Sequence, residues 1–358
     1  MKVLLIGRNR CAVDQLGSYS EKLVMSFDDS FACQRHFPEF DNYTIEYSKT
    51  NVSTLLGVPA RVKEIIRWQR KYAVDVIYTN TKWDMLAAKI ASYFIKGKIA
   101  LISTSHNSYA WQNQKSVKMM SLLIRLTTDV FVSLASFVSE ALLSNYVKRE
   151  SLLLLPNTID ARPWAAKSDY SFRERFRIVY VAYVSPAKGQ DFILKVLEKL
   201  ADRLPIDVDI YGDIDGTPDY VESMKNEVVE SNLYGRFNFC GRIENYELRE
   251  RLMKYDLYLC PSQMEMSPVN ILEAQAAGLP ILAAKVGGIT NLIDDNETGL
   301  LFEPGDVDFV AGMVETLFQD KELREKLGRA GCHYVRTVYT PAHAGEQLKN
   351  MVDDILKM

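Results

Sequence analysis

Two acidic residues, Glu265 and Glu273, stand eight positions apart in the segment CPSQMEMSPVNILEAQAAG. The segment reads as the end of a buried strand that leads into a short helix. Ser267 is a suitable N-cap, Pro268 suits the first helical position, and Gly278 suits the residue just past the helix end. The first amides of such a helix lack intrahelical partners, so the pattern predicts a phosphate-binding helix start.

The two carboxylates suit different parts of a sugar nucleotide. Glu265 precedes the predicted helix and can reach sugar hydroxyls from its loop. Glu273 falls in the second turn, where a buried carboxylate is costly unless hydrogen-bond donors meet it. Vicinal ribose hydroxyls would supply two such donors. The alternative is that both are ordinary acids near the positive end of a helix dipole.

A second strand-to-helix turn, VSPAKGQ, carries Lys188 and Gly189. A lysine there places a compact positive charge near a helix start, which suits a phosphate. A lone lysine before a helix is also commonly just solvated, and the turn by itself leaves both interpretations open.

Two further groups could do chemistry. His106 follows a predicted strand, so its imidazole is expected to point to the carboxyl edge of the sheet, although a structural histidine is the commoner case. Asp213 and Asp215 form an Asp-x-Asp pair that invites a metal interpretation. We favour a loop role for this pair and expect no metal.

Short apolar runs that alternate with helical patterns must position these residues. In the first half we expect strands at 3–6, 75–79, 99–103, 130–133 and 152–155, and helices at 58–72, 83–94, 116–126 and 137–147. In the second half we expect strands at 178–184, 206–211, 237–240, 257–260 and 280–284, and helices at 191–204, 219–231, 247–254 and 268–277. Helical patterns from 307 to 358 follow, interrupted near Pro341. Continuous apolar strands between helices predict parallel sheets covered on both faces.

Two doubly wound domains are therefore expected within the 358 residues. The predicted domains are residues 1–165, completed by the helix 341–358, and residues 166–340. The irregular stretch from 156 to about 176 reads as an interdomain linker. Open α/β sheets bind ligands beyond the carboxyl ends of their strands, so a crevice there is the expected site.

The charge is unevenly distributed along the chain. The net charge is −3, but residues 1–160 hold 20 Lys and Arg against 14 Asp and Glu, or +6, and the remainder holds 23 against 32, or −9. Either the first half meets an anionic lipid or membrane surface, or the asymmetry is chance. The helix 58–72, rich in Lys and Arg, could touch a membrane or simply cover the sheet. Basic residues lack interleaved aromatic platforms, which argues against nucleic acid.

The five cysteines are scattered without metal-ligand spacing, which suits a reducing compartment. The apolar start is too short for a signal peptide, and no stretch has the length of a membrane span. We expect a cytoplasmic protein, with any contact to the inner face of the membrane being peripheral.

The whole pattern resembles the retaining glycosyltransferases of the GT-B fold, family 4. Glu265 and Glu273 match that family's Glu-x7-Glu signature, and the following runs GLPILAA, GG and NETGLLF with PGD are similar to its glycine loop and next turn. The match is good from about residue 155 to 318 and weak before it. The resemblance implies an α/β protein with two Rossmann-like domains facing across a central cleft.

The resemblance also implies roles for individual residues. Glu273 would hold the donor ribose, Glu265 the transferred sugar, and Lys188 the departing diphosphate, while His106 would contact the donor sugar. Further donor contacts would come from Met266, Ser267, Pro268, Val269, Asn270, Gly189, Ile243, Arg242, Gly212 and Gly17. The family has an arginine where this chain has Tyr183, which removes a forked phosphate donor worth about 1.5–3 kcal/mol.

The expected function is transfer of a hexose or N-acetylhexosamine from a nucleoside-diphosphate sugar, with UDP favoured, to a glycan or lipid-linked acceptor. The configuration would be retained, no metal or other cofactor would be needed, and surface polysaccharide or oligosaccharide biosynthesis is the expected setting. Tyr183 keeps a non-catalytic nucleotide-sugar binder open as an alternative, and a GT-B epimerase is a third.

Overall fold

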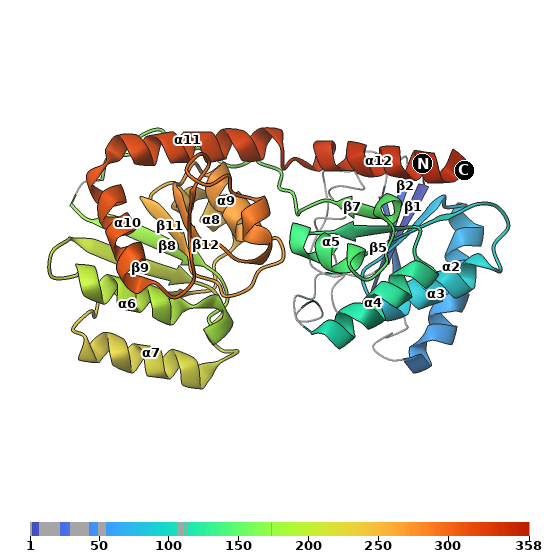
Figure 1. The fold of residues 1–358 in the computed structure, drawn as a ribbon, viewed down its shortest axis with the longest axis horizontal. Helices are drawn as coiled ribbons and strands as arrows, with labels where there is room; N and C mark the ends of the chain where they lie inside the picture. The colour runs from blue at the N-terminus through green and yellow to red at the C-terminus, as the bar shows by residue number, and fades with distance from the viewer. Residues whose placement is uncertain are drawn as a thin grey trace. The chain divides into compact units, whose positions relative to one another are not determined.

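The computed structural model of the chain describes residues 2–6, 22–28, 43–48, 55–105, 111, 113–172 and 174–357, with only the backbone described for 22–28 and 43–48. It divides into two compact units. The first unit comprises Met1–Thr158 with Pro341–Met358, and the second comprises Ile159–Thr340. Figure 1 shows the fold of each unit.

The first unit is built on a seven-stranded parallel sheet of order β3-β2-β1-β4-β5-β6-β7. The strands are β1 (Lys2–Ile6), β2 (Lys22–Asp28), β3 (Tyr43–Ser48), β4 (Val76–Thr79), β5 (Ala100–Thr104), β6 (Val130–Ser133) and β7 (Leu152–Leu154). The helices are the 3-10 helices η1 (Leu55–Gly57) and η3 (Arg149–Ser151) with α2 (Val58–Tyr72), α3 (Lys82–Ser92), α4 (Gln114–Thr127), α5 (Ser136–Leu143) and α12 (Pro341–Lys357).

Successive strand residues point to opposite faces of this sheet, and each face has its own core. Val3 and Leu5 pack with the C-terminal helix α12, whereas Leu4 and Ile6 pack with α2 and α3. The last helix of the chain therefore closes one face of the first sheet.

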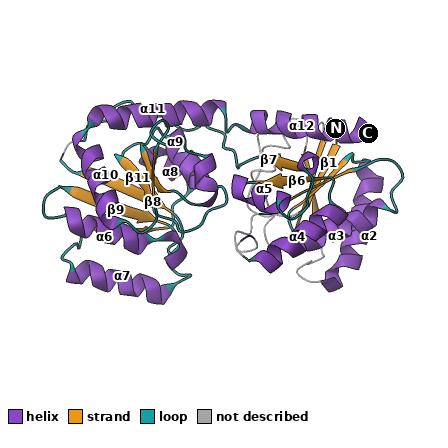
Figure 2. Ribbon diagram, in the orientation of Figure 1, coloured by secondary structure: helices purple, strands orange, loops and turns teal. Residues whose placement is uncertain are grey.

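The second unit has a six-stranded parallel sheet of order β10-β9-β8-β11-β12-β13. The strands are β8 (Phe176–Val181), β9 (Ile206–Tyr211), β10 (Phe237–Gly241), β11 (Leu257–Cys260), β12 (Ile281–Ala284) and β13 (Leu300–Phe302). The helices are η4 (Pro186–Lys188), α6 (Gln190–Leu200), α7 (Pro218–Glu230), α8 (Asn245–Leu252), α9 (Val269–Ala276), η5 (Gly287–Asn291), α10 (Val307–Gln319) and α11 (Lys321–Thr337). Figure 2 shows the sheet between α6 and α7 on one side and α11 on the other.

Three strands were not expected from the sequence. The outer strands β2 and β3 read KLVMSFD and YTIEYS, which mix polar and apolar residues and lack the continuous apolar run used to recognise a buried parallel strand. The third, β13, has only three residues and lies at the edge of the second sheet.

The boundary between the two units, between Thr158 and Ile159, falls inside the stretch 156–176 that the sequence predicts as an interdomain linker. The residues after this boundary pack on the second unit. Trp164 and Tyr170 are buried in the second unit. The ammonium of Lys167 is buried and donates to the Tyr255 carbonyl at 2.5 Å and to Asp256 at 3.2 Å. These contacts fix the irregular segment to the second unit, and the sequence pattern could not show them.

Candidate functional site

The candidate site lies where two neighbouring strands of the second sheet end. Strands β8 and β11 are parallel partners, so the loops that follow them emerge at the same edge. The two loops are joined directly, because the Gln263 amide donates to the Ala187 carbonyl at 3.0 Å. One loop carries Lys188 and the other carries Glu265.

Lys188 and Glu265 form an ion pair between these loops. Lys188 Nζ lies 2.5 Å from Glu265 Oε1, and both side chains are largely buried. The same oxygen accepts a hydrogen bond from Ser262 Oγ at 2.7 Å. Ser262 Oγ in turn lies 2.6 Å from the Tyr180 hydroxyl. A buried chain of hydrogen bonds thus runs from strand β8 to the carboxylate.

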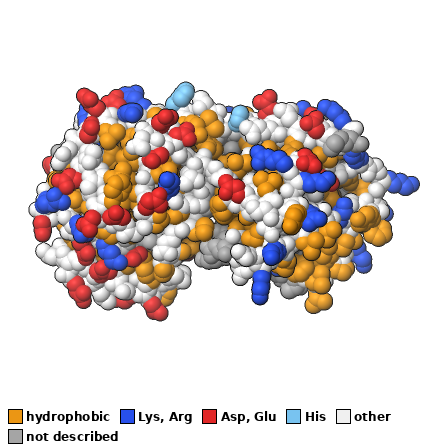
Figure 3. Space-filling view, in the orientation of Figure 1, with side chains coloured by type: hydrophobic (Ala, Val, Ile, Leu, Met, Phe, Trp, Pro, Cys, Tyr) orange, Lys and Arg blue, Asp and Glu red, His pale blue; other side chains and the backbone are white. Residues whose placement is uncertain are grey.

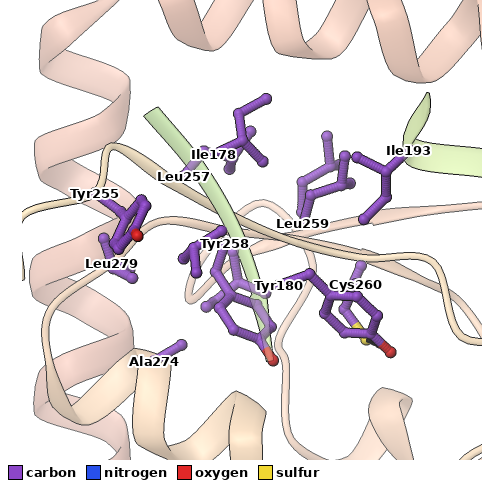
Figure 4. Close-up of a cluster of buried hydrophobic side chains, with 14 of the residues drawn as sticks. Ile178, Tyr180, Ile193, Tyr255, Leu257, Tyr258, Leu259, Cys260, Ala274 and Leu279 are labelled. Atoms are coloured by element: carbon purple, nitrogen blue, oxygen red, sulfur yellow. Dashed lines mark hydrogen bonds between the residues drawn. The ribbon is translucent and has the colours of Figure 1, made fainter. Parts of the chain in front are cut away.

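Tightly packed rings surround the hydrogen-bonded residues at the ends of strands β8 and β11. The rings of Tyr180 and Tyr258 meet edge to face with centroids 5.9 Å apart, and Figure 4 shows them beside Cys260. Burial raises the pKa of both tyrosines well above their usual value, and the negative charge of Glu265 contributes at each. Glu273 also contributes at Tyr258, so both signature carboxylates act on the same buried ring.

The glycine pair after β12 holds the Glu265 backbone. The Gly288 amide donates to the Glu265 carbonyl at 2.9 Å. Gly287 has a φ of +50°, and a Cβ placed there would lie 2.1 Å from the same carbonyl oxygen. Only glycine allows this close approach to the carbonyl oxygen. The Gly287–Gly288 loop therefore holds the Glu265 backbone and so helps to fix the position of its carboxylate.

Helix α9 begins one residue later than expected. Its N-cap is Pro268, not Ser267, because Pro268 has an extended ψ of 115° and the first helical residue is Val269. Ser267 precedes a proline and is itself restricted to extended backbone. The predicted end is confirmed, since Gly278 follows the C-cap Ala277 with a φ of +75°.

The residues expected to bind the donor diphosphate surround this helix start. Met266, Ser267 and Pro268 are buried, and Val269 and Asn270 are half-buried. Asn270 Nδ2 donates to the Val181 carbonyl at 2.6 Å, which ties the helix start to strand β8. Glu273 lies half-buried one turn further along α9.

The Lys188 turn differs from a regular helix start. Ser185 occupies the N-cap position of the 3-10 helix η4 without a side-chain capping hydrogen bond, and Gly189 separates η4 from α6. Tyr183, at the position of the family arginine, is 52% exposed, and Lys188 Nζ lies 5.5 Å from its ring centroid. The ring is therefore a cation–π partner of Lys188.

Three further predicted donor residues, Gly212, Arg242 and Ile243, follow strands β9 and β10. The Gly212 amide donates to the Gly241 carbonyl at 2.8 Å, which joins the two strand ends. Arg242 is exposed and pairs with Asp213. Ile243 is half-buried against the core of the second unit. Gly17 and His106 lie outside the described residues.

The Asp-x-Asp pair is engaged within its own loop. Asp213 accepts from the Asp215 amide at 2.9 Å and pairs with Arg242, and these two contacts lower its pKa. Across the described residues, no group of three or more His, Cys, Asp and Glu side chains has the arrangement of a metal site.

Residues 165–333 match the family model described as glycosyl transferases group 1. The matched segment contains Lys188, Glu265 and Glu273. It is a group 1 glycosyltransferase domain. The match covers this segment of the chain, and the assignment to family 4 stays a prediction.

Relatives of the group 1 domain extend the comparison over most of the chain. A GDP-mannose-dependent α-(1-6)-phosphatidylinositol monomannoside mannosyltransferase from Mycobacterium tuberculosis is 26% identical over 276 residues, which cover 72% of this chain and 71% of the relative. A 2-deoxystreptamine N-acetyl-D-glucosaminyltransferase from Niallia circulans is 24% identical over 288 residues, covering 74% and 72%.

Solved structures confirm the predicted GT-B fold. HepE from Anabaena, solved with UDP and glucose, superposes with a TM-score of 0.82 at 19% identity, covering 99% of this chain and all of the other. Sucrose-phosphate synthase from Thermosynechococcus elongatus superposes with a TM-score of 0.79 at 16% identity, covering 99% of both chains.

Sequence reasoning missed two parts of the group 1 domain. Ser262 and Tyr180 were not singled out, because no local pattern reveals that Ser262 bonds to Glu265 within the loop after β11 or that Tyr180 reaches Ser262 from the neighbouring strand β8. The second is a polar cavity of about 450 Å³ along helix α8, lined by Arg177, Tyr211, Tyr246, Glu247, Glu250, Arg251, Lys254 and Tyr255. None of the predicted site residues lines this cavity.

Proposed function

We propose that this protein is a retaining glycosyltransferase that moves a hexose or N-acetylhexosamine from a UDP-sugar to a hydroxyl of a glycan or lipid-linked acceptor. The observation that carries the proposal is the contact between Lys188 and Glu265. It brings a cation suited to a diphosphate and a carboxylate suited to sugar hydroxyls to one strand-end site of the group 1 domain.

The donor would bind across the two loops. Lys188 and the first amides of α9 offer positive charge where a diphosphate would lie. Within the described chain, no group donates to Glu265 Oε2, so this oxygen is the one that would meet the transferred sugar. Glu273, one turn along α9, would hold the ribose.

The transfer itself exchanges one C–O bond for another. The acceptor oxygen attacks the anomeric carbon, and the bond from that carbon to the diphosphate breaks with its electron pair on the leaving group. A donor phosphate oxygen takes the acceptor proton on the same face, which retains the configuration. Lys188 and the α9 start stabilise the charge that develops on the diphosphate, an electrostatic contribution.

The names and titles of similar proteins bear on the donor base and the acceptor. HepE was solved with UDP and with UDP-glucose, whereas the mycobacterial relative is named for GDP-mannose. We favour UDP, with GDP as the competing result of the test. The mycobacterial acceptor is a phosphatidylinositol mannoside, which supports a lipid-linked acceptor in surface glycan biosynthesis.

We also propose that no metal is required. The cationic role that a divalent ion would take on the diphosphate falls to Lys188 and the α9 amides.

Thermal stability with UDP, GDP, ADP and TDP, each with and without EDTA, tests the proposal. Ligand at about 100 times its Kd adds roughly 2.7 kcal/mol to the unfolding free energy. UDP should stabilise the wild type and the control Glu222→Ala, an exposed carboxylate on α7, but not Glu273→Ala. EDTA should leave the shift unchanged. NMR of the product should then show the donor's anomeric configuration, and an inverted product would overturn the retaining mechanism.

Tyr183 favours a second candidate, a nucleotide-sugar binder without transfer activity. It replaces the arginine of the resembled family and leaves Lys188 as the one basic side chain of that turn. Nucleotide stabilisation together with no transfer to any hydroxyl acceptor would support the binder.

A further inference from the structure

Helix α4 carries apolar side chains on its exposed side. Met119, Leu122 and Leu126 are 55%, 53% and 62% exposed and recur every three or four residues, so they form one stripe on the helix. Val117, Met120 and Ile124 face the interior. The exposed stripe is therefore additional to the side that packs against the unit.

The neighbouring helix α3 ends in two more exposed rings. Tyr93 and Phe94 are 75% and 66% exposed. Helices α3 and α4 pack against one another. In Figure 3, hydrophobic side chains gather over these two helices, with lysine and arginine around them. We call Tyr93, Phe94, Met119, Leu122 and Leu126 the α3–α4 face.

The exposed charges that the described residues between 82 and 127 carry are all positive. Helix α4 contains no acidic residue, and Lys115, Lys118 and Arg125 are exposed along it. Lys96 and Lys98 are exposed just after Tyr93 and Phe94. From residue 82 to residue 127 the sequence contains seven basic residues and one acidic residue, Asp84. Asp84 is buried, with its Oδ1 3.0 Å from Arg61, so it does not offset the surface charge.

We propose that the α3–α4 face lies on an anionic membrane surface. The apolar side chains would enter the boundary between headgroups and acyl chains, and the surrounding cations would meet lipid phosphates. An aromatic residue such as Tyr93 suits that boundary, because its ring is apolar and its hydroxyl is polar. The inference goes beyond the proposed transfer reaction and does not depend on it.

The charge pattern argues against a second copy of the chain as the occupant. A symmetric dimer through this face would place lysines opposite lysines, which is repulsive. The contact would be peripheral, because no helix of the described residues is long and apolar enough to cross a bilayer.

The basic helix α2 (Val58–Tyr72) does not make this membrane contact. Its apolar residues Val62, Ile65 and Trp68 are buried against the sheet, and Arg61 pairs with Asp84. The structure favours the alternative that this helix covers the sheet. The apolar side chains of the proposed contact are instead those of the α3–α4 face.

Sedimentation with sucrose-loaded vesicles tests the proposal, using phosphatidylcholine alone and phosphatidylcholine with phosphatidylglycerol. The full chain should bind the anionic vesicles, and high salt should weaken the binding. The doubles Leu122→Ser/Leu126→Ser and Lys115→Ala/Lys118→Ala should each lower the partition coefficient by roughly tenfold or more. The control Phe309→Ser, which removes an exposed apolar side chain of the second unit, should bind like the wild type.

The result that overturns the proposal is equal sedimentation of both doubles and the wild type, or no binding of the wild type to anionic vesicles. A dimer by light scattering that the Leu122→Ser/Leu126→Ser double dissolves would overturn it in favour of self-association. Retained nucleotide stabilisation in each double shows that the donor site is intact, so failure here is distinct from failure of the proposed reaction.

Discussion

Lys188 Nζ and Glu265 Oε1 lie 2.5 Å apart although the two residues are 77 positions apart in the sequence. The contact joins the loops after β8 and β11, and Ser262 donates to the same carboxylate oxygen. The Lys188 ammonium thus neutralises the Glu265 carboxylate within the site. In the proposed function a bound diphosphate would share or take over the ammonium, and donor binding would then change the position of Glu265.

Replacing Lys188 with alanine should abolish most of the transfer activity. The change removes the cation proposed to stabilise the leaving group, and among the described residues it leaves Ser262 as the remaining hydrogen-bond donor to the buried Glu265 carboxylate. Loss of one preorganised charge-stabilising donor lowers kcat by about 100-fold or more. Initial rates with the nucleotide sugar chosen by thermal stabilisation measure this. Lys195→Ala, an exposed lysine on α6, serves as the control, and a Lys188→Ala rate within twofold of wild type would contradict the assigned role.

Ser262→Ala should lower kcat more than it changes KM. Ser262 is buried and orients Glu265 without reaching a ligand itself, so its loss loosens the carboxylate rather than removing a donor contact. A hydrogen bond to a charged group contributes about 1.5–3 kcal/mol, which corresponds to roughly tenfold or more in rate. Tyr180→Phe should have a smaller effect, because its hydroxyl bonds to Ser262 and not to Glu265. Equal effects on kcat and KM from both variants would instead indicate a general loss of structure.

Tyr183→Arg should strengthen binding of the nucleoside diphosphate. Tyr183 is half-exposed beside Lys188, so an arginine there would not have to lose its hydration. Its planar guanidinium would add two parallel N–H donors to a phosphate. We expect a gain of about tenfold in affinity, or about 1.4 kcal/mol, by calorimetry. Tyr234→Arg, an exposed tyrosine of the same unit, controls for added positive charge. A gain shared by both variants would mean a nonspecific charge effect.

The regular elements were predictable because both parallel sheets are buried. The apolar runs 130–133, 206–211 and 257–260 correspond residue for residue to β6, β9 and β11, and helix 58–72 corresponds to α2. The apolar pattern that predicts each of these segments lies within the segment itself. Strand β13 has no such pattern, because three residues at a sheet edge show no periodicity.

The site was predictable as two separate motifs but not as a contact. The types and spacing of Lys188 and Glu265 pointed to phosphate and sugar chemistry. Their pairing depends on β8 lying next to β11, with β9 and β10 on the other side of β8. Strand order is a property of the whole sheet, so local sequence could not give it. The same reason hid Tyr180, which reaches Ser262 across that strand pair.

Gly287→Ala should destabilise the protein far more than Gly235→Ala. Both glycines have a positive φ, so both substitutions carry the backbone cost of about 1–2 kcal/mol. A Cβ at Gly287 would also lie 2.1 Å from the Glu265 carbonyl, whereas nothing lies within 4 Å at Gly235. We expect Gly287→Ala to cost at least about 2 kcal/mol more in urea unfolding. Equal losses would mean that the loop shifts freely, and the proposed support of Glu265 would be wrong.

Alkaline pH should destabilise the second unit through Cys260. Burial, with the charge of Glu265 adding to it, raises the pKa of this thiol from 9.0 to about 11. Between these values the unfolded chain releases the proton while the folded chain keeps it, so the unfolding free energy falls as the pH rises.

The contribution of Cys260 is therefore complete below pH 9 and lost by pH 11, a total of about 2–3 kcal/mol. Denaturant unfolding across this range should give a shallower decline for Cys260→Ala than for the wild type, although the variant starts from a lower stability near neutral pH because it leaves a small cavity. The buried Tyr180 and Tyr258 remain in both proteins and add the same alkaline loss to each, so the difference between the curves isolates the thiol. Parallel curves would show that the Cys260 environment, which borders Glu265, is open to water.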